Sequence, residues 1–220
     1  MPPPFDLLQP LLQGAVVTVE LTILAGIVGS ICALAAGFGR MSNSRLLRTT
    51  TAVYVEVFRG TSAVVQIFFF FFVLPAAGIS LPAFATGVFA LGINFGAYGS
   101  EIVRAAILNV DPGQRDAAVA LNMTPLTAMR RVIFPQALVG MLPPFGNLLI
   151  ELLKGTSLVS LITLTELTFA GKLLLRAEGR RDEIYVLVLL IYFLLAYPLT
   201  LLVRASERRL ARGLHLGPAQ

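Results

Sequence analysis

The sequence predicts an all-α, polytopic membrane protein, and three observations lead to this fold class. The chain of 220 residues is 56% hydrophobic and only 13% charged, whereas soluble domains carry about 25% charged residues. Its mean hydropathy is +0.82, and its apolar residues fall into long runs. This composition excludes a disordered chain and argues against a soluble enzyme. A single cysteine, Cys32, excludes a disulfide framework, and a single histidine, His215, argues against metal or triad chemistry.

Five segments are long and apolar enough to cross a bilayer, which requires roughly 20 residues. We expect one transmembrane domain over residues 1–220, with spans at about 14–38, 52–74, 82–108, 136–158 and 184–203. The stretch 159–175 is interrupted by polar residues. It is expected to form a short, partly buried helix or a re-entrant segment.

Charge in the connections predicts the orientation. With the N-terminus outside and the C-terminus inside, the inside segments hold eleven Lys and Arg residues and the outside segments four, as the positive-inside rule requires. The outside set comprises Lys172, Arg176, Arg180 and Arg181. It is interpreted either as a solvated loop or as a docking surface.

The inside connection 109–134 predicts two short helices. Asp111 is a suitable N-cap, a proline follows at the first helical position, and Gln114 would complete a capping box. Asn122 suits the left-handed position that ends a helix, and Thr124 begins a second helix before another proline. The pair is either an amphipathic loop on the bilayer or a docking element for a cytoplasmic protein.

Ionisable residues inside the expected spans are costly and usually face a cavity or the bundle interior. Spans two and four each carry an acid and a base three residues apart, followed by Gly-Thr-Ser. These pairs could neutralise each other, or the loosened helix could offer polar groups to a zwitterionic solute. In span three, small residues surround two polar ones and indicate either helix packing or a lined pathway. The candidate pathway residues are Glu56, Arg59, Thr61, Asn94, Tyr98, Glu151, Lys154, Thr156 and Ser157.

Several segments resemble the permeases of bacterial ABC importers. The run Asp116-Ala117-Ala118, Ala120-Leu121-Asn122, Arg130-Arg131 to Pro135 is similar to the EAA loop of that family. Further motifs resemble its polar amino acid branch, whose members carry histidine, glutamine, glutamate, arginine or opines. They are Glu56-Val-Phe-Arg59-Gly-Thr61, Gly96-Ala-Tyr98, Glu101 to Ile107, Gly113-Gln-Arg115 and Lys154-Gly-Thr156-Ser157-Leu158. Asp116 replaces the family's Glu, and Asn122 replaces its Gly.

The resemblance implies a type I importer permease in the bacterial cytoplasmic (inner) membrane, with 109–134 as a cytoplasmic coupling helix. The residues that it implies contact the ATPase are Asp116, Ala117, Ala118, Leu121, Asn122, Arg130, Arg131 and Pro135. The implied partners are an ATPase dimer that binds ATP and Mg, a second permease subunit, a substrate-binding protein and membrane lipid. No metal or nucleic acid is expected to bind this chain. The sequence contains no phosphate-binding G-x-x-x-x-G-K-[ST] loop of its own.

Three function classes were weighed. The first is a permease subunit that moves a polar amino acid, or a compatible solute such as ectoine, by ATP-driven alternating access. The second is a small secondary carrier or channel that works without ATP, although such a protein has no need of the helix–Asn–helix loop. The third, an intramembrane protease, lacks a membrane-embedded histidine and a pair of intramembrane aspartates. The choice between a homodimer and a heterodimer stays open.

Overall fold

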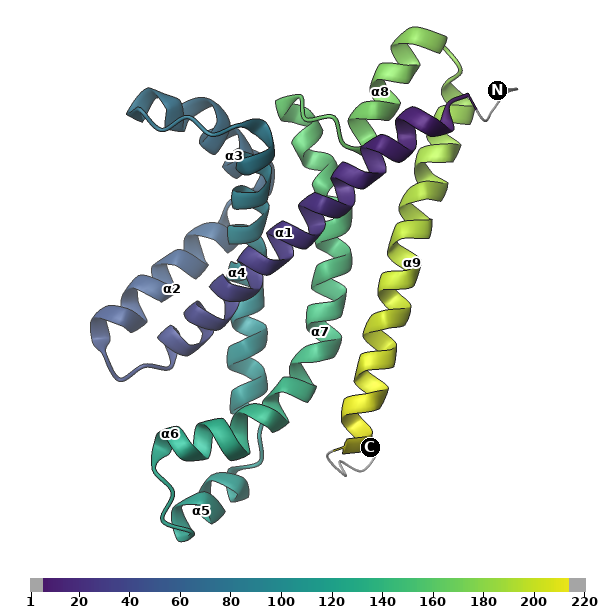
Figure 1. Ribbon diagram of the computed structural model, residues 1–220. Coiled ribbons are helices and arrows are strands. Elements are labelled where there is room, and N and C mark those ends of the chain that lie inside the picture. Colours follow the sequence, from purple (N-terminus) through teal and green to yellow (C-terminus); the bar gives the residue numbers. More distant parts are fainter. Residues whose placement is uncertain (1–5, 214–220) are drawn as a thin grey trace.

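The computed structural model describes residues 6–213, with side chains up to Ser206; His215 lies outside the described residues. Within this range the chain forms only helices and short connections, which confirms the all-α prediction (Figure 1). The start of α1 (Leu8–Arg40) and α8 (Leu167–Glu178) lie at one end of the molecule. The short helices α5 (Pro112–Ala120) and α6 (Pro125–Ala128) lie at the other, together with the end of α9 (Arg181–Gly213).

A seam of small residues joins α1 to α4 (Ala83–Leu108). A Cβ atom added at Gly96 would lie 2.5 Å from the Cβ of Cys32, and one added at Gly29 would lie 2.5 Å from a ring carbon of Phe95. Larger residues would therefore force the two helices apart, as expected for small residues at a membrane helix interface. The two helices cross in the middle of the molecule, where Leu21, Ala25 and Leu91 belong to the largest buried cluster.

The single helix expected over 52–74 is instead a bent pair. Helix α2 (Arg45–Gly60) and the following helical segment, which starts as α3 (Ala63–Phe68) and runs on to Ala77, meet at 107°. Thr61 between them is extended, with φ −117° and ψ 153°. The physical reason is the Gly-Thr-Ser sequence: glycine is a poor helix former, and Thr and Ser bond to nearby backbone. A π-helical turn at Phe69–Val73 follows.

The helical segment over residues 125–162 is assembled from several pieces. A π-helical turn at Met129–Ile133 connects α6 to α7 (Phe134–Gly155), which contains Pro143 and Pro144, and a 3-10 turn at Thr156–Ile162 completes it. Because proline cannot donate a backbone hydrogen bond, these residues loosen the helix from within. Within the stretch 159–175, α8 begins at Leu167 after a left-handed Thr163.

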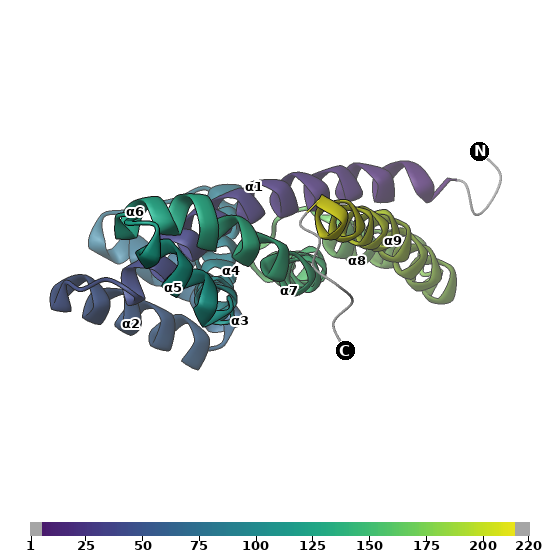
Figure 2. The ribbon, with the colours of Figure 1, turned by 90° about the horizontal axis from the view of Figure 1, so that it is seen from below.

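Three helical units are long and apolar enough to cross a membrane, namely Leu8–Arg40, Pro125–Ile162 and Arg181–Ser206, and the bent α2–α3 pair could form a fourth. Helix α4 is 26 residues long, but its glycines and polar residues lower its mean hydropathy. Five spans with the N-terminus outside therefore stay a prediction. Figure 2 shows α5 and α6 beneath the α2–α4 side of the molecule, with α9 on the other side.

Candidate functional site: a polar membrane face and a cytoplasmic helix pair

The break between α2 and α3 leaves backbone carbonyls at the end of α2 without helical partners, and side chains satisfy them. The Thr61 hydroxyl donates to the Val57 carbonyl at 2.8 Å. The amides of Gln66 and Asn94 donate to the Phe58 carbonyl at 2.9 and 3.2 Å. Such capping is what a broken helix needs at membrane depth, where water is scarce.

Gln66 is the functional-site residue that sequence reasoning missed. It is 6% exposed, it donates to both oxygens of Thr61, and its own oxygen accepts from Asn94 at 3.0 Å. Thus Thr61 and Asn94, which belong to different predicted spans, meet through it. A signal was present, because Gln66 is a lone amide in an apolar run just after Gly-Thr-Ser.

Glu101 on α4 is the centre of an ion cluster. Its Oε1 atom accepts from Arg40 at the end of α1 and from Nη1 of Arg59 at 2.9 Å. The Arg59 guanidinium also lies 5.5 Å from the centre of the Tyr98 ring. The pairing of Glu56 with Arg59, one of the two possibilities that the sequence leaves open, is not formed: Arg59 binds Glu101 of α4, and the exposed Glu56 forms no ion pair within the described part of the chain.

Helix α7 carries a stripe of exposed small and polar residues. They recur every three or four positions and so share one face: Gly140, Pro144, Asn147, Glu151 and Lys154. A groove of about 720 Å³ lies between the first part of this stripe and the end of α4, with Glu101, Asn109, Gln136 and Pro144 among its walls. The expected Glu151–Lys154 ion pair is not among those that the described residues form.

Two candidate pathway residues lie away from this stripe. Thr156 is fully buried, and its hydroxyl donates to the Leu153 carbonyl at 2.7 Å. Ser157 follows it in the 3-10 turn and is partly buried. Thr156 does not share the face of Glu151 and Lys154, because it follows Lys154 by two residues and so lies about 200° around the helix.

The buried Glu166 accepts a set of hydrogen bonds at the end of the molecule opposite α5 and α6. Its carboxylate accepts from the backbone N–H groups of Thr168 and Phe169, both at 2.8 Å, and from the Tyr192 hydroxyl at 3.1 Å. Burial raises the pKa of this carboxyl, while the backbone and hydroxyl donors act in the opposite direction. Glu166 therefore caps α8 and links it to α9. Of the cations that are predicted to lie outside, Arg180 pairs with Asp6 and Glu183, and Lys172 donates to Ser160.

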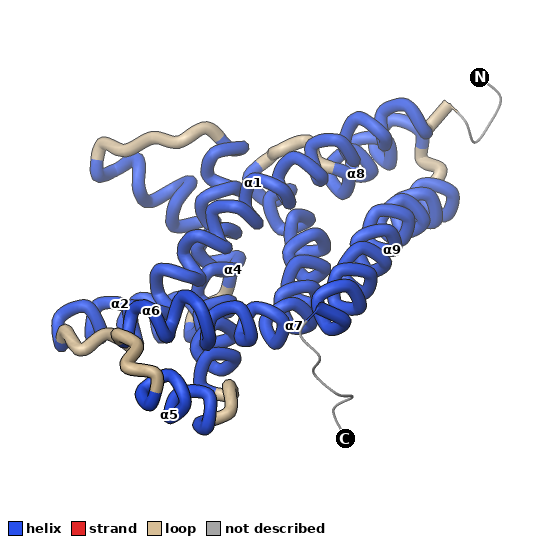
Figure 3. Tube along the Cα trace, turned by 60° about the horizontal axis from the view of Figure 1, so that its bottom comes forward, coloured by secondary structure: helices blue, strands red, loops and turns tan. Residues whose placement is uncertain are grey.

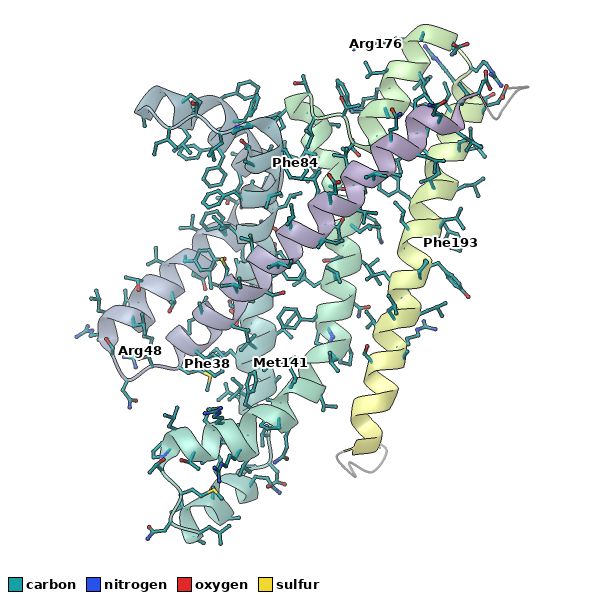
Figure 4. All side chains as sticks on the ribbon, viewed as in Figure 1. Phe38, Arg48, Phe84, Met141, Arg176 and Phe193 are labelled. Carbon is teal, nitrogen blue, oxygen red and sulfur yellow. The ribbon has the colours of Figure 1, made fainter. Side chains whose placement is uncertain are left out.

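The opposite face of the molecule is mainly apolar, although the exposed Glu20 of α1 interrupts it. The exposed side chains of α1 and α9 are mainly aliphatic or aromatic, such as Ile31 at 64%, Leu194 at 64% and Phe193 at 60%. Phe193 projects away from the bundle in Figure 4, and α9 contacts the rest mainly through α7 and α8 (Figure 3). Such a face suits lipid, whereas the charged face of α2, α4 and α7 needs water or protein against it.

The helix pair formed by α5 and α6 has the predicted local structure. The Asp111 carboxylate caps α5 by accepting from the Gly113 N–H at 2.6 Å, and the Thr124 hydroxyl caps α6. Asn122 is left-handed with φ 59°, as predicted. The expected capping box is not formed, because the Gln114 side chain turns to Gln136 at 3.3 Å.

The apolar surface of this pair differs from the expected one. Ala118, which the resemblance places among the ATPase contacts, is only 2% exposed and therefore offers little surface to a partner. The prominent apolar side chains are instead Val119 at 74%, Leu121 at 70% and Leu126 at 78%. Asp116, Ala117, Asn122, Arg130 and Arg131 are exposed, and Pro135 is partly buried near the start of α7.

Two hydrogen bonds tie α5 to the membrane helices. The Arg115 guanidinium donates to the Ile107 carbonyl of α4 at 2.9 Å, and Gln114 accepts from Gln136 of α7. A push on α5 would therefore reach both helices that form the polar groove. Neither link was predicted from the sequence.

A helical membrane protein with one mainly apolar face, one ionisable face and a structured helix pair at one end has the features of a transport subunit. Residues 25–212 match the family described as binding-protein-dependent transport system inner membrane component. The chain belongs to this family. It is therefore a non-catalytic membrane component of a transport system.

Named relatives cover nearly the whole chain. A probable amino-acid ABC transporter permease protein, y4tF of Sinorhizobium fredii, is 44% identical and covers 94% of this chain and 90% of its own length. The glutamine transport system permease protein GlnP of Escherichia coli is 37% identical, with 91% and 92% covered. The L-cystine transport system permease protein TcyB of Bacillus subtilis is 41% identical, with 95% and 92% covered.

Solved structures agree with the fold. A chain of an amino acid ABC transporter crystallised with histidines superposes with a TM-score of 0.86 at 38% identity, covering 91% of this chain and 94% of that one. A chain of the MetNI methionine transporter in an inward-facing conformation superposes with a TM-score of 0.79 at 20% identity, covering 96% and 99%. The latter likeness concerns the fold alone.

Proposed function

We propose that this chain is the permease subunit of an ABC importer for a polar amino acid, and that the solute passes along the face formed by the end of α2, α4 and α7. The observation that carries this proposal is the exposure of Arg59, Glu151 and Lys154, with the partly exposed Glu101, on one side of a molecule whose other side is mainly apolar. Charged side chains facing lipid would be strongly unfavourable. A water-filled path bounded by a second permease removes that cost.

The second subunit is either another copy of this chain or a similar chain. The occurrence in Sinorhizobium fredii of two relatives, y4tF and the 36% identical y4tG, favours a pair of similar but different permeases. The groove between α4 and α7 and the exposed stripe of α7 would face that partner across the solute path.

The exposed apolar residues of α5 and α6 would dock on a separate ATPase, which binds ATP and Mg. An apolar cluster on a short cytoplasmic helix pair has little use in a carrier that works without ATP. Closure of the ATPase dimer would press on α5, and the Arg115 and Gln114 hydrogen bonds would transmit this motion to α4 and α7. The result would be alternating access of the polar face to the two sides of the membrane.

At the other end of the molecule, Arg176 and Arg181 are exposed beside Glu178 and Asp182. We propose that a substrate-binding protein docks there. Mixed rim charges of this kind govern the rate of encounter more than the affinity.

The test is purification of the tagged chain from its native membrane in mild detergent, followed by reconstitution into liposomes. Co-purification of an ATPase in stoichiometric amount, and uptake of a labelled L-amino acid that requires ATP and a binding protein, are expected. Recovery of the chain alone, with uptake that proceeds without ATP, would contradict the proposal. The identity of any co-purified permease distinguishes a homodimer from a heterodimer.

A further inference from the structure

The ion cluster around Glu101 carries more positive than negative charge. Arg40 and Arg59 both bind its Oε1 atom, and Arg104 lies near enough to act on it electrostatically. Even with the exposed Glu56 of α2 included, three arginines face two carboxylates. Arg40 ends α1 and Arg104 lies near the end of α4 that leads to α5, so the excess of positive charge lies toward one end of the polar face, where an anion or water can compensate it.

Arg59 is the member of the cluster that can accept another anion. Its side chain is 39% exposed, against 16% for Arg40. Only Nη1 has a hydrogen-bond partner within the described part of the chain, so the remaining N–H groups of the guanidinium are free for a further ligand. A guanidinium presents its donors as a planar fork that matches the two oxygens of a carboxylate.

The surroundings hold the guanidinium in place. The Tyr98 ring lies beside it at 5.5 Å, and the Tyr98 hydroxyl points to the Arg59 carbonyl at 3.5 Å. The backbone before it is fixed by the contacts of Gln66 and Asn94 with Phe58. Arg59 is therefore a preorganised donor at the wall of the polar face.

We infer that Arg59 binds the carboxylate group of the transported amino acid and that Glu101 is the counter-ion exchanged for it. This inference rests on the proposed function, because it names the chemistry of one position on the same path. When the solute carboxylate takes Arg59, Glu101 keeps its contact with Arg40, so neither the arginine nor the glutamate is left unpaired. When the solute leaves, Glu101 binds Arg59 again and the guanidinium is no longer available to a solute carboxylate.

The exchange gives the path a direction of release. Glu101 lies seven residues before the end of α4, on the side that leads to α5, whereas Lys154 is next to the last residue of α7 at the far end. Arg59 therefore marks a position nearer the predicted cytoplasmic side. Competition by Glu101 for Arg59 assists release of the solute there instead of holding it.

The experiment measures direct binding to the purified, complete permease–ATPase complex. A panel of labelled L-amino acids first identifies the bound solute, and its affinity is then compared with that of the corresponding amino acid amide, which lacks the carboxylate. The wild-type complex is expected to prefer the acid at least about tenfold, the value of one charge-assisted hydrogen bond. R59Q should reduce this preference to within about twofold of none, and R59K should give an intermediate value because it keeps the charge and loses the fork.

The E101Q substitution should change the preference for the acid in the opposite direction to R59Q. Removing the competing carboxylate should strengthen binding of the acid severalfold, leave binding of the amide unchanged and slow release of the solute during transport. R48Q is the matched control, because Arg48 is an exposed arginine of α2 outside the cluster (Figure 4). It should leave the preference as in the wild type.

The outcomes separate the two proposals. If no amino acid binds the wild-type complex although ATP-dependent uptake is retained, the inference is overturned and the proposed function stands; if uptake is absent as well, the proposed function itself fails. If an amino acid binds and R59Q keeps the full preference for the acid, or E101Q weakens acid and amide equally, the cluster is only a structural link and the inference is overturned. Should R59Q fail to assemble, R59K and E101Q still decide, because E101Q must increase the preference.

Discussion

The two exposed faces of this molecule meet different surroundings. On the face of α1 and α9, large aliphatic and aromatic side chains point outward, and few polar groups interrupt them. On the face of α2, α4 and α7, exposed arginine, glutamate, lysine, asparagine and proline side chains are spread along the helices. In a soluble protein the first face would be an anomaly, but in a membrane the second face needs the explanation. The difference teaches that the partner and the path must lie on the polar side.

A charge placed on each face gives the largest contrast. Phe193→Lys puts an ammonium on the face assigned to lipid and should cost about 2.5–3.5 kcal/mol of insertion free energy. Asn147→Lys, on the exposed stripe of α7, should cost far less, because water or protein is available there. Protease protection in membranes and the yield of monodisperse protein measure both effects. Equal losses in the two variants would remove the distinction between the faces.

Substitutions in α5 and α6 test whether the apolar side chains there are exposed because they contact a soluble subunit, and not lipid or the solute path. Leu126→Glu should weaken ATPase binding at least about tenfold, since burial of a leucine contributes about 1.5–3 kcal/mol. Its thermal stability should stay unchanged, because Leu126 contacts little within the chain. Ala118→Glu should instead lower the thermal stability of the segment, because the substitution buries a charge. Co-purification and thermal unfolding in detergent distinguish these outcomes.

Removing a side chain that caps the carbonyls at the α2–α3 bend should have an effect on stability of similar or smaller size. Gln66→Leu should destabilise the protein by about 1–3 kcal/mol, because the Phe58 and Thr61 carbonyls lose a donor. Gln13→Leu, at an exposed position of α1, should have little effect. The effect of Asn94→Leu should not add to that of Gln66→Leu, since the two amides share one network. Strict additivity in thermal unfolding would indicate that the amides act independently.

The smallest expected effect on stability comes from the exposed ionisable residues themselves. Lys154→Met should change stability by no more than about 0.5 kcal/mol, as do most exposed substitutions, and still lower uptake severalfold in liposomes. Normal uptake by this variant would place Lys154 off the path. A variant that fails to fold would show that Lys154 stabilises the bundle instead.

Much of the local structure could be predicted from the sequence. The apolar runs gave α1, α4 and α9 close to their observed positions, and the capping residues gave α5, the left-handed Asn122 and α6. These features depend on residues near one another in the chain. The bend after Gly60 was foreseen only as a loosening, because its angle of 107° depends on how Gln66 and Asn94 hold the carbonyls.

The partners of the ionisable residues could not be predicted, for a physical reason. Helical spacing identifies neighbours three or four positions apart, but Arg40 and Arg59 reach Glu101 from 61 and 42 residues away. The inward turn of Ala118 has the same origin. It follows from the packing of the whole segment, which no short pattern contains.

The seam between α1 and α4 limits how the subunit can move. Glycines face Cys32 and Phe95 so closely that sliding one helix along the other would bring side chains into collision. The two helices must therefore travel as one rigid body. The subunit can still bend after Gly60 and at Pro143 and Pro144 in α7. These two places act as hinges, and the backbone at those few positions determines how far the helices can move.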